Sequence, residues 1–218
     1  MESYKREFIQ FLENAGVLKF GDFTAKSGRK IPYFINAGMI KTGEDIAKLG
    51  EFYAKAYNDK LGAKKAVLYG PAYKGISLAV SAAVALSKNG LNVPFFFNRK
   101  EVKDHGEGGV FVGYVPTAPE EVVIIEDVIT AGTAIRESMD ILSHLEGVKV
   151  AATFIMVNRK EKGQTDKGAM EEITEQFGFP VYSIVDVYDI IEYLEEGGKN
   201  AEDVERIKKY LEVYGAKA

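Results

Sequence analysis

The segment EVVIIEDVITAGT, residues 121–133, constrains the fold of this chain more than any other part of the sequence. It opens with a run of β-branched residues, 122–125, a pattern typical of a strand buried on both faces of a parallel sheet. Two acids, Glu126 and Asp127, follow where that strand is expected to end, and small residues then lead into an amphipathic helix expected over residues 134–145. The pattern therefore predicts that a strand, a tight turn and a helix meet at one edge of a parallel sheet.

The residue types in this turn indicate what it could bind. The unpaired backbone N–H groups and the dipole of a helix N-terminus favour an anion such as phosphate. The carboxylates of Glu126 and Asp127 can accept hydrogen bonds from the vicinal hydroxyls of a ribose or hold a hydrated Mg²⁺. Together they indicate a ribose 5-phosphate ligand, but the same residue types also end strands in ordinary α/β proteins, so the pattern alone leaves both interpretations open. Neither a Walker loop (GxxxxGK[ST]) nor a dinucleotide fingerprint (GxGxxG) occurs in the chain.

The length and composition of the chain exclude several classes of protein. Its 218 residues fit one domain, residues 1–218, and a hydrophobic content of 46% can fill a core. The formal net charge of −4 argues against a nucleic-acid partner, and the absence of cysteine excludes disulfides and thiolate chemistry. No apolar run approaches the length of a membrane span, and the first residues do not form a signal peptide. We therefore expect a cytoplasmic protein without a membrane partner.

Hydrophobic periodicity along the rest of the chain predicts strands and helices in alternation. Strands are expected at residues 17–23, 31–35, 66–69, 93–98, 122–125, 150–157 and 181–187. Helices are expected at residues 4–15, 44–58, 76–88, 134–145, 167–177, 189–196 and 201–214.

The string IIEDVITAGTAIRES, residues 124–138, resembles the signature with which type I phosphoribosyltransferases bind phosphoribosyl diphosphate (PRPP), and especially that of the orotate phosphoribosyltransferases. Three further stretches, FTAKSGR, GPAYKG and RKEVKDHGEGG, resemble other motifs of the orotate enzymes and occur in the family's order. The resemblance covers most of the chain. It implies a type I phosphoribosyltransferase-like α/β fold, with a mostly parallel central sheet flanked by helices and a small N-terminal hood built largely from residues 1–40.

The resemblance also implies a set of PRPP-binding residues drawn from all four motifs. Without it, the cationic turn around Lys26 is typical of a solvated tip, and GPAYKG is typical of an ordinary strand-to-helix turn. The catalytic residues that it implies are Lys103, His105 and Asp127. The implied PRPP contacts are Lys26, Tyr73, Lys74, Arg99, Lys100, Lys103, His105, Glu126, Asp127, Val128, Ile129, Thr130, Ala131, Gly132, Thr133 and Ala134.

For an orotate pocket, the resemblance implies four residues: Phe34, Ile35, Thr130 and Arg159. The guanidinium of Arg159 would grip the orotate carboxylate, since the two groups can pair bidentately. Two positions depart from the family pattern. Ile35 stands where the family commonly has a second phenylalanine, so contacts from its main chain would survive but an aromatic contact would not. Asn158 stands where bacterial relatives usually have an aspartate.

Residues 99–109, RKEVKDHGEGG, are charged, glycine-rich and poor in apolar anchors, so we expect them to be exposed and mobile. By composition alone they form an ordinary charged hairpin. The resemblance implies instead a catalytic lid that reaches the active site of a neighbouring subunit, and hence a homodimer. Cations in such a lid would stabilise the negative charge that grows on a departing diphosphate, and its closure would exclude water.

The activity implied by the resemblance is Mg²⁺-dependent transfer of the 5-phosphoribosyl group from PRPP to orotate. The products would be orotidine 5′-monophosphate and diphosphate, in a step of pyrimidine synthesis. Mg²⁺ would be held by PRPP and water near Glu126 and Asp127, without a direct protein ligand. Two alternatives remain open: a purine-type phosphoribosyltransferase, which shares the PRPP signature, and a PRPP-binding regulatory protein that does not catalyse the transfer.

Overall fold

The computed structural model describes residues 1–25, 28–103, 109–197 and 201–216. In these ranges the main sheet has seven strands, and its neighbouring strands are parallel except for the antiparallel pair β4 and β5. Residue Val157 of β8 pairs with β7 and β9 at once, so β6 and β7 follow one edge of β8 and β9 follows the other. The strands are β3 (Val67–Gly70), β4 (Phe95–Lys103), β5 (Gly109–Gly113), β6 (Glu121–Ile125), β7 (Val128–Ile129), β8 (Lys149–Asn158) and β9 (Val181–Asp186).

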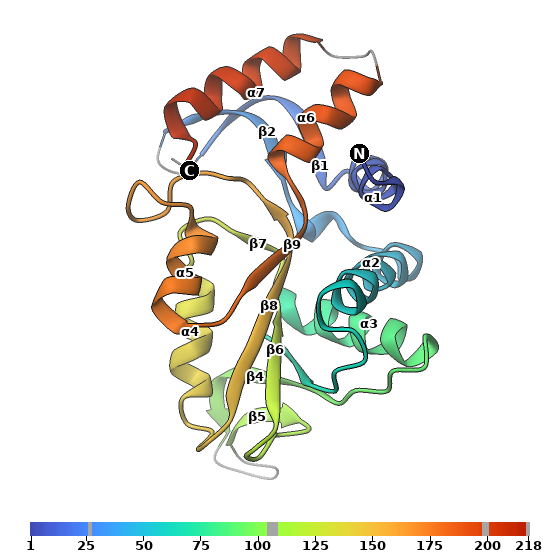
Figure 1. Cartoon of the computed structure of the whole chain (residues 1–218), viewed down its shortest axis with the longest axis vertical. Helices are drawn as coiled ribbons and strands as arrows, with labels where there is room; N and C mark the ends of the chain where they lie inside the picture. Colours follow the sequence, from blue (N-terminus) through green and yellow to red (C-terminus); the bar gives the residue numbers. More distant parts are fainter. Residues whose placement is uncertain (26–27, 104–108, 198–200, 217–218) are drawn as a thin grey trace.

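Helices cover both faces of this sheet, as Figure 1 shows. The helices α2 (Gly43–Leu61) and α3 (Lys74–Lys88) lie on one face, and α4 (Thr133–Leu142) and α5 (Ala169–Phe177) lie on the other. Because successive side chains of a strand point to opposite faces, Val123 belongs to one buried cluster and its neighbours Val122 and Ile124 belong to the other. The predicted α/β fold with a mostly parallel sheet is confirmed.

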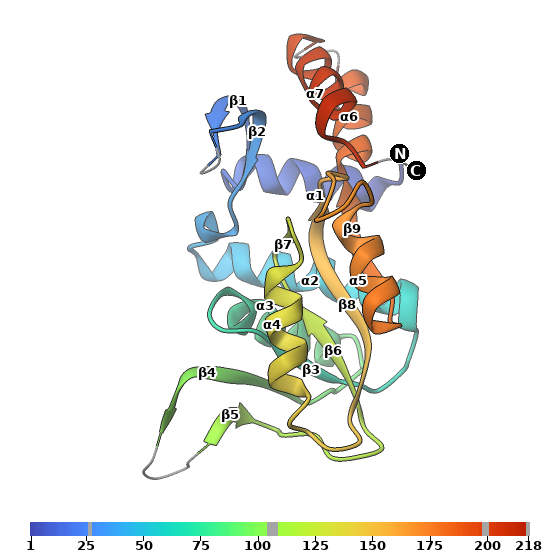
Figure 2. The ribbon, with the colours of Figure 1, turned by 90° about the vertical axis from the view of Figure 1, so that its left-hand side faces the viewer.

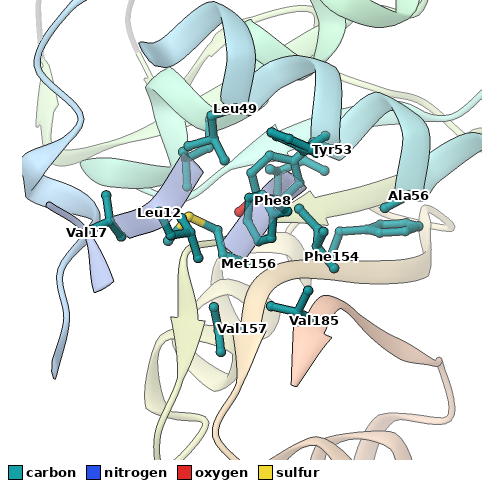
Figure 3. Packing of buried hydrophobic residues seen from close by; sticks show 14 of the residues in the cluster. Phe8, Leu12, Val17, Leu49, Tyr53, Ala56, Phe154, Met156, Val157 and Val185 are labelled. Atoms are coloured by element: carbon teal, nitrogen blue, oxygen red, sulfur yellow. The ribbon is translucent and has the colours of Figure 1, made fainter. Parts of the chain in front are cut away.

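The first helix, α1 (Ser3–Asn14), is part of the main core (Figure 3). The ring of Phe8 is fully buried, and its centroid lies 4.8 Å from that of Phe52 on α2. On β8, the ring of Phe154 stacks on Tyr57 of α2 with centroids 5.8 Å apart. Truncating a buried phenylalanine typically costs about 3–5 kcal/mol, so these contacts fix α1 and α2 firmly against the sheet.

An antiparallel hairpin of β1 (Leu18–Thr24) and β2 (Lys30–Ile35) forms a separate two-stranded sheet, followed by a short 3₁₀ turn, Ala37–Met39. Figure 2 shows this hairpin at one end of the molecule beside α6 (Val187–Glu196) and α7 (Ala201–Tyr214), with the β4–β5 hairpin at the opposite end. The rings of Tyr33 on β2 and Tyr210 on α7 pack edge to face, with their centroids 6.3 Å apart. The N-terminal hairpin therefore packs against the C-terminal helices.

The predicted helices and strands are present, with bounds shifted by a few residues, but three features differ. Strand β4 continues past the expected end at residue 98 as far as Lys103, because its charged residues still pair with β5, which was not predicted. Strand β7 was also missed, since two residues are too few to show a periodicity. Among the described residues, no helix is both long and apolar enough to span a membrane.

Candidate active site

Glu126 and Asp127, the acid pair, directly follow the last residue of β6 and precede β7. The amide of Glu126 donates to the carbonyl of Phe154 (3.0 Å), and the amide of Met156 donates to the carbonyl of Asp127 (2.8 Å). Strand β7 then continues along the same edge of β8. The predicted end of the strand before the acids is confirmed, because β6 ends at Ile125. The two hydrogen bonds to β8 fix the position of the acids between β6 and β7.

The carboxylates of the acid pair are both buried, and each is held by a backbone amide. Glu126 Oε1 accepts from the amide of Asp127 (2.9 Å), and Asp127 Oδ1 accepts from the amide of Val128 (2.8 Å). The ammonium of Lys74 donates to Asp127 Oδ2 (2.9 Å). Burial, followed by repulsion from Asp127, raises the pKa of Glu126 to about 8. The site therefore holds one carboxylate paired with a cation and one whose ionised form is disfavoured.

The loop between β7 and α4, residues 130–132, turns on Gly132. This residue has φ 74°, and a Cβ there would lie 2.8 Å from Nη1 of Arg136, so both the backbone conformation and the space require glycine. No side chain caps the N-terminus of α4, which leaves its first amides for another acceptor. A cavity of about 310 Å³ adjoins this loop, and it is lined by Glu126, Val128, Ile129, Thr130, Gly132, Thr133, Ala134, Ile135 and Glu137.

A second cavity of about 530 Å³ adjoins the first, because Glu126, Ala134 and Glu137 border both. Its other walls include Pro71 and Ala72 from the β3–α3 loop, and Arg99 and Lys100 from β4; the remaining lining residues are Asn98, Val110, Ser138, Asp140 and Ile141. The predicted PRPP residues of three separate motifs thus meet around the acid pair.

The side chain of Asn98 ties β4 to the β3–α3 loop. It is buried, and its Oδ1 accepts from the amide of Ala72 (2.9 Å) and from the hydroxyl of Tyr69 (2.8 Å). Next to this anchor, the ammonium of Lys100 lies 5.1 Å from the ring centroid of Tyr73, which is itself 70% exposed. Lys100 and Tyr73 were both predicted to contact PRPP; they lie in contact with each other, and Lys100 lines the second cavity.

Asn158 pairs with Ile129 across the β7–β8 ladder. Arg159 is the next residue, so the backbone of Arg159 is close to the β7–α4 loop. Its guanidinium lies 5.2 Å from the ring centroid of Tyr33 on β2, and Nη2 lies 2.6 Å from Oε1 of the buried Glu161. The other oxygen of Glu161 accepts from Arg29 (2.9 Å). Burial raises the pKa of Tyr33 to about 12, so its phenol remains neutral beside the two cations.

The two hood residues predicted to touch orotate differ in exposure. The ring of Phe34 is 43% exposed and stacks on Phe23 with centroids 5.4 Å apart. The side chain of Ile35 is buried in the core, so only its main chain is left to meet a ligand. The departure of Ile35 from the family's phenylalanine is therefore a substitution within the core.

Three predicted residues lie wholly or partly outside the described part of the chain. Lys26 and His105 are outside it, and for Lys103, which ends β4, only the backbone is described. Sequence reasoning missed Asn98, Arg136 and Glu161. Their contacts join residues 26, 40 and 132 positions apart in the chain, and no local pattern in the sequence marks such partners.

The donor set around the acid pair suits a metal ion that keeps part of its water shell. Within the described residues, no cluster of three or more histidine, aspartate or glutamate side chains could hold a metal. The acid pair supplies two carboxylates, and one oxygen of each already accepts a backbone amide. Mg²⁺ commonly keeps several waters and takes one or two carboxylates together with substrate phosphates, and this arrangement fits that pattern.

The chain is similar to known proteins over its whole length. Residues 36–185 match the phosphoribosyl transferase domain. The orotate phosphoribosyltransferase of Aliivibrio fischeri is 49% identical over 216 residues, covering 99% of this chain and 100% of the relative, and that of Lachnoclostridium phytofermentans is 46% identical over 225 residues, covering all of both. The crystal structure of orotate phosphoribosyltransferase from Francisella tularensis superposes with a TM-score of 0.85 at 37% identity, covering 96% of this chain and 99% of the other.

Proposed function

The chain belongs to the orotate phosphoribosyltransferase family, and on that premise we propose that it transfers the 5-phosphoribosyl group of PRPP to orotate, with Mg²⁺ as cofactor. The products would be orotidine 5′-monophosphate and diphosphate, in pyrimidine synthesis. The observation that carries the proposal is the pair of adjoining cavities, which brings the β7–α4 loop, the acid pair and the cations of β4 around one space.

In the proposed complex, each part of PRPP meets a group suited to its charge. The 5-phosphate binds the amides of the β7–α4 loop, and the ribose hydroxyls donate to the acid pair. The diphosphate lies in the second cavity, where Arg99 and Lys100 form part of the wall. Lys74, which contacts Asp127, and Tyr73, which contacts Lys100, are further proposed PRPP contacts, and Lys26 would complete the set. Mg²⁺, bound with PRPP, supplies positive charge to the diphosphate oxygens and orients them.

In the transfer step, a ring nitrogen of orotate attacks the anomeric carbon of the ribose, and the proton on that nitrogen passes to an oxygen of the departing diphosphate. The bond from that carbon to diphosphate breaks, and its electron pair leaves with the diphosphate. Positive charge grows on the ribose ring while negative charge grows on the leaving group, so cations already held near the diphosphate lower the barrier. Lys103 and His105 belong to the lid that we propose to close over the diphosphate and exclude water.

Orotate would lie between the N-terminal hairpin and the end of β8. Phe34 offers a partly exposed ring, and we assign Thr130 and the main chain of Ile35 to the same pocket. The guanidinium of Arg159 binds the carboxylate of orotate in this proposal, supported by its place beside the β7–α4 loop.

We also propose that the protein acts as a homodimer in the cytoplasm. Strands β4 and β5 lie at the edge of the sheet, at the end of the molecule opposite the N-terminal hairpin (Figure 2), which supports a contact with a neighbouring subunit. A lid shared in this way would make each active site depend on two copies of the chain.

Two other functions are distinguished by one set of assays. A purine-type phosphoribosyltransferase would turn over adenine or xanthine rather than orotate, and a regulatory protein would bind PRPP without releasing diphosphate. Initial rates are measured with PRPP and each of orotate, adenine and xanthine in turn, by monitoring diphosphate release. We expect turnover with orotate and none with either purine. Turnover with a purine, or PRPP binding without diphosphate release, would replace the proposed function.

A further inference from the structure

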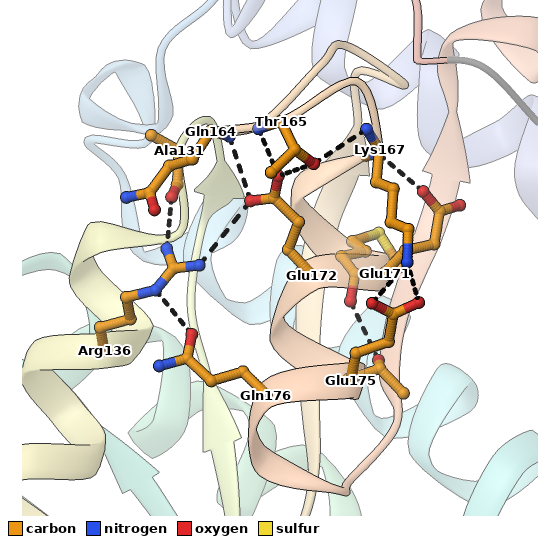
Figure 4. Close-up of polar contacts among 12 residues, drawn as sticks. Ala131, Arg136, Gln164, Thr165, Lys167, Glu171, Glu172, Glu175 and Gln176 are labelled. Carbon is orange, nitrogen blue, oxygen red and sulfur yellow. Dashed lines mark hydrogen bonds and ion pairs between the residues drawn. The ribbon is translucent and has the colours of Figure 1, made fainter.

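The side chain of Arg136, in the second turn of α4, joins the β7–α4 loop to α5 (Figure 4). Its Nη1 donates to the carbonyl of Ala131 (2.6 Å), and its Nε donates to Oε1 of Gln176 (2.8 Å). Its Nη2 lies 3.7 Å from Oε2 of Glu172. One planar guanidinium thus contacts the loop and two side chains of a helix 40 residues further along the chain.

Glu172, in turn, is held by the segment that follows Arg159. Its carboxylate accepts from the amides of Gln164 (3.1 Å) and Thr165 (2.7 Å) and from the hydroxyl of Thr165 (2.7 Å). The carboxylate is buried, so its position is set by these bonds rather than by solvent. The carboxylate of Glu172 that faces Arg136 is therefore held in place by three hydrogen bonds.

The contact with Ala131 controls the direction of a backbone amide. In a trans peptide, the N–H of one residue points opposite to the C=O of the residue before it. The Ala131 carbonyl is turned toward Arg136, so the N–H of Gly132 is turned away from it, and Gly132 lines the first cavity. The missing Cβ of Gly132 leaves the room that Arg136 needs to make this contact.

We propose that Arg136 is a positioning residue for the β7–α4 loop: by holding the Ala131 carbonyl, it fixes the Gly132 amide in the direction needed to bind the phosphate of a ribose 5-phosphate ligand. Gln176 and Glu172 hold the guanidinium in place for this task. The inference rests on the proposed function, in which this loop binds the 5-phosphate of PRPP. Arg136 itself lines neither cavity.

The test compares Arg136→Ala with a matched control, Arg206→Ala, which removes an arginine that pairs with Asp203 on α7 and with Asp22 on β1. Equilibrium binding of ribose 5-phosphate is measured by calorimetry, and KM is measured separately for PRPP and for orotate. For Arg136→Ala we expect the Kd of ribose 5-phosphate and the KM of PRPP to rise roughly tenfold, the loss of a hydrogen bond that orders a binding group. The KM of orotate should change less than twofold, and the control should match the wild type.

Further variants separate positioning from charge. Arg136→Lys keeps the charge but cannot hold Ala131 and Gln176 at once, so it should recover only part of the loss. Gln176→Ala should weaken ribose 5-phosphate binding in the same direction but less, and it decides the question if Arg136→Ala does not fold. Unchanged ribose 5-phosphate binding, equal rises in both KM values, or full recovery by lysine would overturn the proposal. Because this binding needs no orotate turnover, failure of the proposed function would show separately in the rate assay.

Discussion

The ammonium of Lys74 lies 2.9 Å from Oδ2 of Asp127 and joins the first residue of α3 to the acid pair. The lysine side chain is more than half exposed, so this ion pair contributes little to stability, about 0–1 kcal/mol. Its effect is on the site, because it holds a cation beside a buried carboxylate that directly follows Glu126, a lining residue of both cavities. Several expected outcomes depend on this arrangement.

Replacing Asp127 with asparagine should raise the KM of PRPP, because a neutral amide cannot balance Lys74 or receive ribose hydroxyls as strongly as a carboxylate does. Initial rates over a range of PRPP concentrations measure the effect. Glu126→Asp is the matched comparison and should be tolerated better than Glu126→Ala. PRPP saturation identical to that of the wild type would mean that the acid pair is only structural.

The raised pKa of Glu126 predicts a pH dependence of stability. In the unfolded chain this carboxyl has its ordinary pKa of 4.5, and burial followed by the charge of Asp127 raises the pKa to about 8 in the fold. The folded state therefore binds the proton more tightly, so the contribution of Glu126 is full below pH 4.5 and is lost as the pH rises to about 8.

The free energy of unfolding, measured with urea at several pH values, should therefore fall across this window. The expected fall is about 1.4 kcal/mol for each pH unit between the pKa of Glu126 in the unfolded chain and its pKa in the fold. Glu126→Gln carries no charge at any pH, so its free energy of unfolding should fall less over the same range. Parallel curves for the variant and the wild type would show that Glu126 does not titrate there.

Arg159→Ala should impair the use of orotate far more than the use of PRPP. The loss of one charge-assisted contact corresponds to roughly 1.5–3 kcal/mol. The loss is measured as the kcat/KM of the wild type for orotate divided by that of the variant. Uracil, which lacks the carboxylate, should be a poor substrate of the wild type for the same reason. Equal losses for both substrates would assign Arg159 to the structure of the hood instead, through its contacts with Tyr33 and Glu161.

The shared lid predicts complementation between two inactive variants. Lys103→Ala should lower turnover by roughly 10²–10³-fold, by analogy with removal of a preorganised donor, and Asp127→Ala should be nearly inactive for a different reason. After subunit exchange, a mixed dimer has one site in which an intact Asp127 meets an intact Lys103 from its partner. Random exchange should restore about a quarter of wild-type activity per site. Persistent inactivity despite verified exchange would show that the lid serves its own subunit.

The parts of the site that lie close together in the sequence could be predicted from it. The acid pair, the β7–α4 loop and the start of α4 form one local pattern, and the structure brings seven of the predicted residues around one cavity: Glu126, Val128, Ile129, Thr130, Gly132, Thr133 and Ala134. The roles of Asn98, Arg136 and Glu161 could not be predicted, because each depends on a partner that only the tertiary fold brings near.

The backbone pairing that extends past the apolar runs, of β7 with β8 and of β4 with β5, could not be predicted from sequence patterns either. The acids at residues 126 and 127 mark the end of an apolar run, but backbone hydrogen bonds to β8 do not depend on side-chain polarity, so the ladder continues into β7. The same reason explains how the charged residues of β4 pair with β5. Hydrophobic periodicity locates burial, and it does not locate every backbone pairing.

The most direct test of the central claim is the initial rate of orotate consumption by the purified protein with PRPP, in the presence of Mg²⁺ and after its removal by a chelator. We expect orotidine 5′-monophosphate and diphosphate to form in equal amounts, the rate to fall to background with the chelator, and activity to return when Mg²⁺ is added back. A folded protein that binds PRPP but forms no orotidine 5′-monophosphate under these conditions would contradict the account.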